Sequence, residues 1–286
     1  MSTPEPVRRA QEIESWSNRV LVHPLSAKLV PWFAAHGITP NQVSLGGLAC
    51  GVLAGVAYAF SYHSSLAVLG FALMFAWHVL DGADGQLARL TNSFSELGKI
   101  IDGVCDYVTF TAIYIGFAYL LMPRAGDWVL GLIILSGAAH ALQSASFEMQ
   151  RQVYNVFGLG RKSAALPVPG SAAKPGLAGT LYWVYERAQI LMAGGAASFT
   201  PIFKAALASA CPEEAEALRA KFRAQFAPII RQWALFSSNT RTGLIFLCAV
   251  TGWPLLYFVV ELLVLSWALW WFLRRQRGLY GGFELT

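Results

Sequence analysis

Long apolar stretches recur along the chain and predict membrane-spanning helices, because a helix needs about 20 apolar residues to cross the hydrocarbon core. Four stretches are long enough for one span each. A fifth is long enough for two, since Gly252, Trp253 and Pro254 mark a turn within it. The stretches are Val43–Tyr62, Leu66–Leu80 continuing to Leu90, Ile100–Met122, Trp128–Phe147 and Thr242–Leu273. We therefore predict an all-α integral membrane protein with six transmembrane helices.

The segments outside these spans predict four parts of the chain. Apolar positions recur at helical intervals from Ile13 to Phe33, which is typical of an amphipathic helix lying on a membrane surface. Pro212 followed by two acidic residues marks a helix start within a long insertion. The parts are residues 1–40 (N-terminal interfacial segment), 41–149 (transmembrane helices 1–4), 150–237 (helical cytoplasmic or interfacial insertion) and 238–286 (helices 5–6 and cytoplasmic tail).

Span 1 carries a glycine at every fourth position, at Gly47, Gly51 and Gly55. Small residues at this spacing let neighbouring helices approach closely in lipid. We interpret this row as a packing surface without chemistry of its own.

Composition and charge agree with a membrane protein. The chain is 56% hydrophobic with a mean hydropathy of +0.48, and 13% of it is charged, against about 25% for a soluble domain. If both termini are cytoplasmic, every basic residue except Arg124 lies on the cytoplasmic side, as topology rules favour. The net charge of +5 is then a signal of topology and of anionic lipid, and nucleic-acid binding is not expected. We expect a protein of a bacterial-type inner membrane with a cytoplasmic active site.

Four aspartates cluster where spans 2 and 3 meet. Their spacings place them on one face of each helix. The link Leu90–Leu97 is short, so the two spans are antiparallel neighbours and the faces can meet near the cytoplasmic end. The face on span 2 contains Asp81, Asp84, Gly85 and Ala88, and the face on span 3 contains Gly98, Asp102 and Asp106.

The energetic cost of these acids predicts a cation. One acidic residue at membrane depth costs about 2.5–3.5 kcal/mol on insertion scales, and Arg89 with Lys99 cannot neutralise four. Clustered carboxylates suit Mg²⁺, Mn²⁺ or Ca²⁺ rather than zinc or copper. Two ions about 3.5–4 Å apart would fit four carboxylates and bridge a pyrophosphate.

Two glycines accompany the acids. Gly85 and Gly98 each lie one turn from an aspartate and leave the facing helix surfaces without side chains. We interpret them as room for a nucleotide or phosphate, with ordinary helix packing as the alternative.

The segment from Asp81 to Asp106 resembles the signature of the CDP-alcohol phosphotransferase family at all eight of its fixed positions. These are Asp81, Asp84, Gly85, Ala88, Arg89, Gly98, Asp102 and Asp106. The resemblance implies that an alcohol hydroxyl attacks a phosphorus of a CDP-alcohol and that CMP leaves. It also suggests a homodimer. The insertion at 150–237 is longer than the minimal family fold, which leaves the acceptor open.

Roles for the motif residues follow from this reaction. Asp81, Asp84 and Asp102 would hold Mg²⁺ or Mn²⁺ against the pyrophosphate. Asp106 is the candidate general base and a further metal ligand, and Asp102 also counts as catalytic. Arg89 would reach a phosphate or anchor the acids. By resemblance, Gly85 and Ala88 belong to the cytidine pocket.

Other polar residues are weaker candidates. His140, Ser144 and Glu148 share one face of span 4 and are candidates for the acceptor pocket, with interhelical hydrogen bonding as the alternative. Arg241 would bind an acceptor or lipid phosphate, or serve only as a topology charge. Glu261 lies inside span 6, where a carboxylate is rare. Its expected role is either catalysis or pairing with a partner such as a histidine. His78 precedes Asp81 by one turn and is expected behind the ligands.

Several functions stay open at this point. The leading one is transfer from CDP-diacylglycerol to a polar alcohol such as inositol phosphate, glycerol phosphate or serine. Its rival uses CDP-choline or CDP-ethanolamine and a lipid alcohol. Intramembrane prenyltransferases also use aspartates and Mg²⁺, but the Asp84-Gly85 element and its spacing argue against them. An ion transporter would place its carboxylates near the midplane with broken helices.

Overall fold

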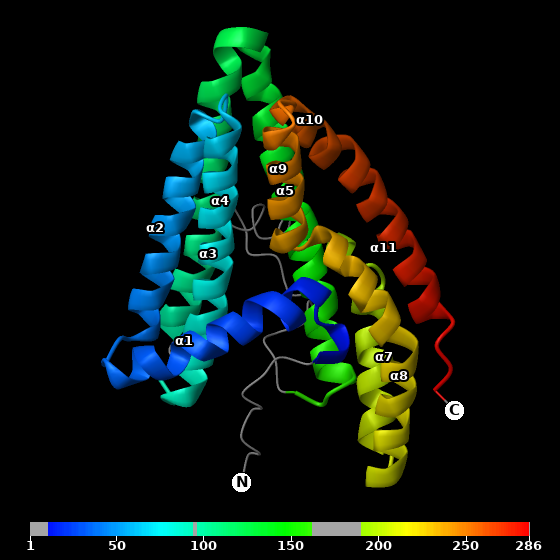
Figure 1. Ribbon diagram of the computed structural model, residues 1–286. Helices are drawn as coiled ribbons and strands as arrows, with labels where there is room; N and C mark the ends of the chain where they lie inside the picture. The colour runs from blue at the N-terminus through cyan, green and yellow to red at the C-terminus, as the bar shows by residue number, and fades with distance from the viewer. Residues whose placement is uncertain (1–10, 94–95, 162–189, 286) are drawn as a thin grey trace, which may run out of the picture. The chain divides into compact units, whose positions relative to one another are not determined.

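The computed structural model describes residues 11–93, 96–161 and 190–285, and every regular element within these ranges is a helix (Figure 1). In chain order the elements are η1 Gln11–Ile13, η2 Asn18–Val22, α1 His23–Ala35, α2 Pro40–Ala59, α3 Ser64–Leu90, α4 Glu96–Ala125, α5 Trp128–Phe157, α7 Ala196–Ser209, α8 Pro212–Gln232, η3 Trp233–Phe236, α9 Ser238–Val250, α10 Pro254–Val259, η4 Val260–Leu265 and α11 Ser266–Gly281. Of the short η elements, η2 and η4 are π-helical.

Among the described residues, five helical segments are long and apolar enough to cross a membrane. They are Pro40–Ala59, Ser64–Leu90, Gly103–Ala125, Trp128–Phe157 and Pro254–Gly281. This confirms an all-helical integral membrane protein. The sixth predicted span corresponds to α9, whose 13 residues rise about 20 Å, less than the ~30 Å of a hydrocarbon core. The count of six spans therefore stays a prediction.

Helical structure lies in the N-terminal segment and ends just before α2, while the predicted interfacial amphipathic helix stays a prediction. This helical structure consists of the π turn η2 followed by α1. Thr39 then caps α2: its Oγ1 accepts from the Gln42 N–H, and its own N–H donates to Gln42 Oε1 at 2.8 Å. Figure 1 shows α1 crossing α2 and α3 at the end where α2 begins and α3 finishes. Its position on a membrane surface stays a prediction.

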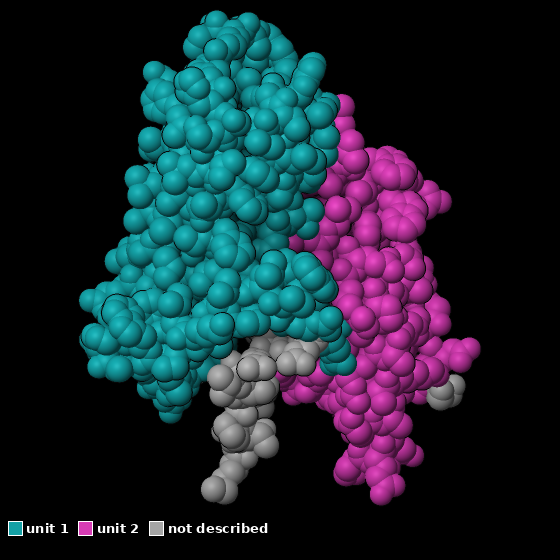
Figure 2. All heavy atoms as spheres, viewed as in Figure 1, with its two compact units in different colours: residues 1–138, 238–262 teal, residues 139–237, 263–286 magenta. Residues whose placement is uncertain are grey.

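The chain forms two compact units, coloured separately in Figure 2. Unit 1 comprises residues 1–138 and 238–262, and unit 2 comprises residues 139–237 and 263–286. The helix α5 contributes its first third to unit 1 and its remainder to unit 2. All four motif aspartates belong to unit 1, so the site is described within that unit.

Close packing of α2 against α4 is the main feature of unit 1. A Cβ atom added to Gly55 would lie 2.6 Å from the carbonyl carbon and oxygen of Ala112. One added to Gly51 would overlap the side chain of Thr109, and one added to Gly116 would overlap the carbonyl oxygen of Gly55. The two helices therefore touch backbone to backbone, and the packing role predicted for the glycine row is confirmed.

Replacing Gly55 by Val should destabilise the protein markedly. The new methyl groups would meet the α4 backbone, which cannot rotate away as a flexible side chain could, and overpacking of this kind costs about 1–3 kcal/mol or more. The measurement is the unfolding temperature of the purified protein in detergent. Gly243→Ala on α9 is the control, because no atom lies within 4 Å of its added Cβ. Equal unfolding temperatures for the two variants would contradict the close contact.

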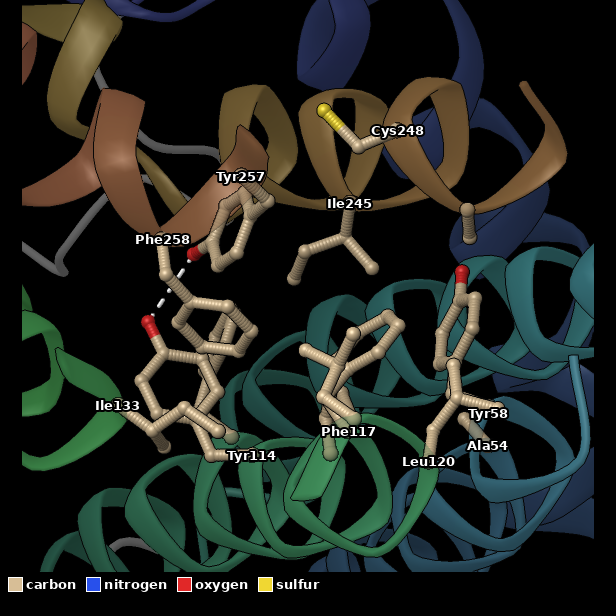
Figure 3. Close-up of a cluster of buried hydrophobic side chains, with 14 of the residues drawn as sticks. Ala54, Tyr58, Tyr114, Phe117, Leu120, Ile133, Ile245, Cys248, Tyr257 and Phe258 are labelled. Atoms are coloured by element: carbon tan, nitrogen blue, oxygen red, sulfur yellow. Dashed lines mark hydrogen bonds between the residues drawn. The ribbon is translucent and has the colours of Figure 1, made fainter. Parts of the chain in front are cut away.

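A cluster of aromatic and aliphatic side chains joins the remaining helices of unit 1 (Figure 3). Tyr58 of α2 stacks on Phe117 of α4 with ring centroids 5.0 Å apart. Phe258 of α10 meets Phe117 edge-on at 5.8 Å, and Ile245 of α9 is fully buried in the same cluster. The α9–α10 hairpin is thereby held against the helices that carry the motif.

Unit 2 has a separate aromatic core. Stacked and edge-on rings join α7, α8 and the C-terminal end of the chain; they belong to Phe199, Phe203, Phe222, Phe226, Tyr280 and Phe283. The predicted helix start at Pro212 is confirmed. There the Cys211 N–H donates to Glu214 Oε2 at 2.9 Å, and this hydrogen bond holds the pKa of the Glu214 carboxyl below its usual value.

The helix α5 extends to Phe157, although the apolar stretch ends at Phe147. Its end is stabilised from α8: the Arg219 guanidinium donates to the carbonyls of Val156 and Phe157 at 3.0 and 2.9 Å. Cationic groups at a helix C-terminus also interact favourably with the helix dipole. The helix therefore continues past the predicted span because side chains of the insertion satisfy its last carbonyls.

Candidate active site

One ring contact relates the two helices that carry Asp81 and Asp106. The rings of Trp77 on α3 and Phe110 on α4 meet edge-on with centroids 5.5 Å apart. Asp81 follows Trp77 by one turn, and Asp106 precedes Phe110 by one turn. Because the short link after Leu90 makes α3 and α4 antiparallel, both aspartates lie one turn, about 5.4 Å, beyond the ring contact and toward the same end.

Asp84 is oriented by a residue of α2. Its side chain is buried, with the whole residue 6% exposed, and its Oδ2 accepts a hydrogen bond from the Ser44 hydroxyl. The motif itself does not reveal Ser44. The signal in the sequence is that Ser44 precedes Gly47 and Gly51 by three and seven residues, on the same glycine face that packs against neighbouring helices.

The surface of α3 at Gly85 is open apart from one cation. A Cβ atom added there would lie 3.7 and 3.9 Å from Nη1 and Nη2 of Arg89 and, in the described part of the chain, would meet no other side chain within 4 Å. A guanidinium beside bare backbone is suited to a phosphate group. The geometry agrees with the predicted approach of a substrate at Gly85.

The N-terminal helix covers the motif at Gly82. The Ser26 hydroxyl donates to the Val79 carbonyl at 2.7 Å and would lie 2.7 Å from a Cβ atom at Gly82. His23, whose Nε2 contacts the Glu14 carboxylate, packs at the same place. Any side chain at position 82 would push α1 away from α3. These contacts are not visible from the sequence, since they join segments more than fifty residues apart.

The remaining motif positions are only partly described. Gly98 and Asp102 lie in α4, but outside the residues whose side chains the structure describes. Asp106 is half-buried, with its Oδ1 atom inaccessible, and Ala88 is half-buried on α3. Among the described side chains no three of His, Cys, Asp or Glu lie close enough to hold a metal ion. Asp81, Asp84 and Asp106 are among these described side chains, so the three do not form such a group, and Asp102 lies outside the described side chains. The metal site therefore stays a prediction.

The helix α9 packs beside the aspartates through a buried hydrogen bond. His78 Nε2 and Thr242 Oγ1 are 2.8 Å apart, and both residues are buried. His78 lies one turn before Asp81, so this bond joins α9 to the segment of α3 that carries the first aspartate. The expected position of His78 behind the ligands agrees with this arrangement.

Arg241 and Glu261 form a fully buried ion pair. Arg241 Nε lies 3.1 Å from Glu261 Oε1, and both side chains are 0% exposed. The second oxygen of Glu261 accepts from the Tyr257 hydroxyl at 3.1 Å, and Tyr257 in turn bonds to Tyr114 at 3.0 Å (Figure 3). The partner of Glu261 is thus an arginine rather than a histidine. A role for Arg241 with an acceptor phosphate stays a prediction.

The candidates on span 4 belong to unit 2. Glu148 accepts from Arg151 at 2.7 Å, one turn along α5, and its side chain is 49% exposed. His140 and Ser144 precede it on the same helix and are half-buried. Their assignment to an acceptor pocket stays a prediction, since the aspartates lie in unit 1.

Comparison with known proteins places this site in a family. The CDP-alcohol phosphatidyltransferase family model matches residues 37–200, which is more than half of the chain and includes every motif position. Cholinephosphotransferase 1 of Gallus gallus is 30% identical over 113 residues, covering 37% of this chain and 32% of that protein.

Two bacterial relatives show similar identity. The CDP-diacylglycerol–serine O-phosphatidyltransferase of Helicobacter pylori strain J99 is 29% identical over 140 residues, covering 46% of this chain and 53% of that protein. The inner membrane protein YnbA of Escherichia coli K12 is 30% identical over 101 residues, covering 35% of this chain and 50% of that protein. The chain thus spans about a third to a half of the length of these relatives. The family match, together with the motif on α3 and α4, shows that the chain belongs to the CDP-alcohol phosphatidyltransferase family, a family of transferases.

Proposed function

We propose that the protein transfers a substituted phosphate group from CDP-diacylglycerol to a polar alcohol and releases CMP, as a step of phospholipid synthesis. The observation that carries this proposal is the hydrogen bond by which Ser44 orients the buried Asp84. The Trp77–Phe110 ring contact, one turn from Asp81 and Asp106, also supports it. The family match over the same helices supports it.

The donor set fits a hard divalent cation. Two Mg²⁺ or Mn²⁺ ions would be held by the four aspartates, because carboxylate oxygens are the ligands that these ions prefer. The aspartates are Asp81, Asp84, Asp102 and Asp106. When bound, the ions would neutralise the pyrophosphate and the departing CMP. Ser44 supports this role, since its hydrogen bond holds one Asp84 oxygen and thereby orients the other.

The transfer step then assigns a role to each of the other site residues. Asp106 accepts the proton of the acceptor hydroxyl as that oxygen bonds to the phosphorus next to diacylglycerol. The bond between this phosphorus and the bridging oxygen breaks, and CMP leaves with the bonding electrons. Arg89, beside the open backbone at Gly85, binds a phosphate oxygen of the donor. Gly98 and Ala88 leave room for the nucleotide.

A lipid donor is favoured over a lipid acceptor. Both kinds of enzyme occur among the relatives, but the serine phosphatidyltransferase matches 46% of this chain and the cholinephosphotransferase 37%. The basic residues of the insertion favour an anionic acceptor such as inositol phosphate or glycerol phosphate, with Arg241, His140 and Glu148 as candidate acceptor residues. The second candidate is transfer from CDP-choline or CDP-ethanolamine to a lipid alcohol.

The membrane arrangement completes the proposal. Both termini and the aspartates face the cytoplasm of a bacterial-type inner membrane, and α1 lies along that face. Exposed apolar side chains of the N-terminal segment support this position, among them Trp16 before η2 and Leu25 and Trp32 of α1. A homodimer is expected from the family resemblance.

The full-length protein in lipid nanodiscs provides the test. We expect CMP release when CDP-diacylglycerol, Mg²⁺ or Mn²⁺ and one alcohol of a panel are present, and no release when a chelator is added. The panel contains serine, glycerol phosphate, inositol and inositol phosphate. A second arm supplies CDP-choline or CDP-ethanolamine with diacylglycerol. CMP in that arm alone would select the second candidate, and no CMP in either arm from folded protein would refute transfer altogether.

A further inference from the structure

An open groove of about 390 Å³ lies on unit 1 where α1 ends and α2 begins. Its walls come from three elements of the unit, namely α1, the start of α2, and α3. The lining residues are Phe33, Ile38, Gln42, Val43, Gly46 and Leu80. A volume of this size is within the usual range for a bound small molecule, about 300–1,000 Å³.

The groove lies on a different face of α2 from the contact with the aspartates. Gln42 and Gly46 are exposed and one turn apart, whereas Ser44 between them is buried and bonds to Asp84. On α3, Leu80 precedes Asp81 directly, so their side chains diverge by about 100°. The groove therefore opens toward the surroundings of the helices, and the carboxylates lie elsewhere.

The polarity of the groove is graded along α2. Five of its six lining residues are apolar or glycine, and the exception, Gln42, is held at the start of the helix by the Thr39 N–H at 2.8 Å. Elsewhere on α2, apolar side chains such as Leu45 and Leu53 are more than half exposed. In a spanning helix, such a surface is in contact with lipid acyl chains.

We propose that this groove binds one acyl chain of a bulk membrane phospholipid, with the glycerol ester region at Gln42 and the chain running along α2. Hydrocarbon is the occupant that fits, because five of the six lining residues are apolar or glycine and α2 is long and apolar enough to cross a membrane. The lipid would fill the angle between the crossing helix α1 and the spans α2 and α3. It would thereby bind α1 to the membrane-spanning part of unit 1.

Gly46 offers a clean way to block the groove. A Cβ atom added there would meet only Leu80 Cδ1, at 4.0 Å, so Gly46→Leu fills the groove without moving the backbone. Gly131→Leu is the matched control. Gly131 is also an exposed glycine of a spanning helix, α5, and no atom lies within 4 Å of its added Cβ. Both variants gain the same helix propensity and the same side chain.

The test is photolabelling in palmitoyl-oleoyl phosphatidylcholine nanodiscs that contain a small fraction of phosphatidylcholine with a diazirine on its acyl chain. Peptide mass spectrometry then locates the adducts. We expect adducts concentrated on the lining residues, with a yield that falls about tenfold in Gly46→Leu and is unchanged in Gly131→Leu. Gly46→Ala adds only one methyl group and should give an intermediate adduct yield. If Gly46→Leu unfolds, the yield of Gly46→Ala tests the proposal in its place.

Three outcomes would overturn the proposal. Adducts spread over all lipid-facing helices would mean that no chain is held. An unchanged yield in both Gly46 variants would place the chain elsewhere. The third outcome uses CDP-diacylglycerol, added at the same concentration as the photolabelled phosphatidylcholine. If it lowers the adduct yield far more than its dilution of the probe predicts, the occupant is the substrate and not a bulk phospholipid. None of these readings depends on transferase activity.

Discussion

Asp106→Asn should lower the rate of CMP release by about 10³-fold, within the 10²–10⁴ range of a general acid–base residue. Asparagine keeps the shape of the side chain but cannot accept the proton of the acceptor hydroxyl. It also removes one negative charge from the predicted cation site, so the Mg²⁺ concentration needed for half-maximal rate should rise. The measurement is CMP release in nanodiscs across a Mg²⁺ titration.

The matched control for this variant is Asp127→Asn, which makes the same change at an exposed aspartate between α4 and α5. It should match the unsubstituted protein in rate and in Mg²⁺ dependence. Both variants should keep the unfolding temperature, since asparagine has the same shape as aspartate and Asp106 is only half-buried. If Asp106→Asn retained the full rate with the same Mg²⁺ dependence, the assignment of this aspartate to the reaction would be wrong.

Breaking the Arg241–Glu261 pair should destabilise unit 1 by about 3–5 kcal/mol, because removing one partner leaves a buried charge without compensation. Glu261→Gln keeps the volume and the bond from Tyr257 but removes the charge. The double variant Arg241→Gln/Glu261→Gln should recover much of this loss. A double-mutant cycle on the unfolding free energy of the purified protein measures the coupling.

The exposed pair Arg151–Glu148 on α5 provides the comparison. Its atoms lie closer, at 2.7 Å, but water screens the charges and the pair should contribute only about 0.2–1 kcal/mol. If the losses of unfolding free energy in the two single variants, at Arg241 and at Glu261, simply added up in the double variant, the coupling would be zero. Burial of this pair would then not matter for stability.

Helix positions in this protein follow from apolar length, since lipid leaves few alternatives to a helix. That rule predicts α2 to α5 well. It fails where a helix continues past its apolar stretch, as α5 does to Phe157, because capping by Arg219 and ring contacts with α7 stabilise the helix there. For α9 the rule decides nothing, since this helix has 13 residues and is followed by a turn at Gly252.

The aspartates are predictable because carboxylates are costly in apolar spans and their spacing is local. Their partners are not. The contacts of Ser44 with Asp84, of Ser26 with the Val79 carbonyl and of Arg241 with Glu261 all depend on which helix faces meet. Glu261 could be recognised as needing a partner, but the identity of that partner requires the packing of α9 against η4.

The backbone contact between Gly55 and Gly116 has a mechanical consequence. Helices whose main chains touch cannot slide or roll past each other without losing this backbone contact, so α2 and α4 must move as one body. Ser44 on one and Asp106 on the other are then held at a constant separation during turnover. Room for an entering substrate has to come from elements that meet this body through side chains, and α9, which is followed by a turn at Gly252, is one such element of unit 1.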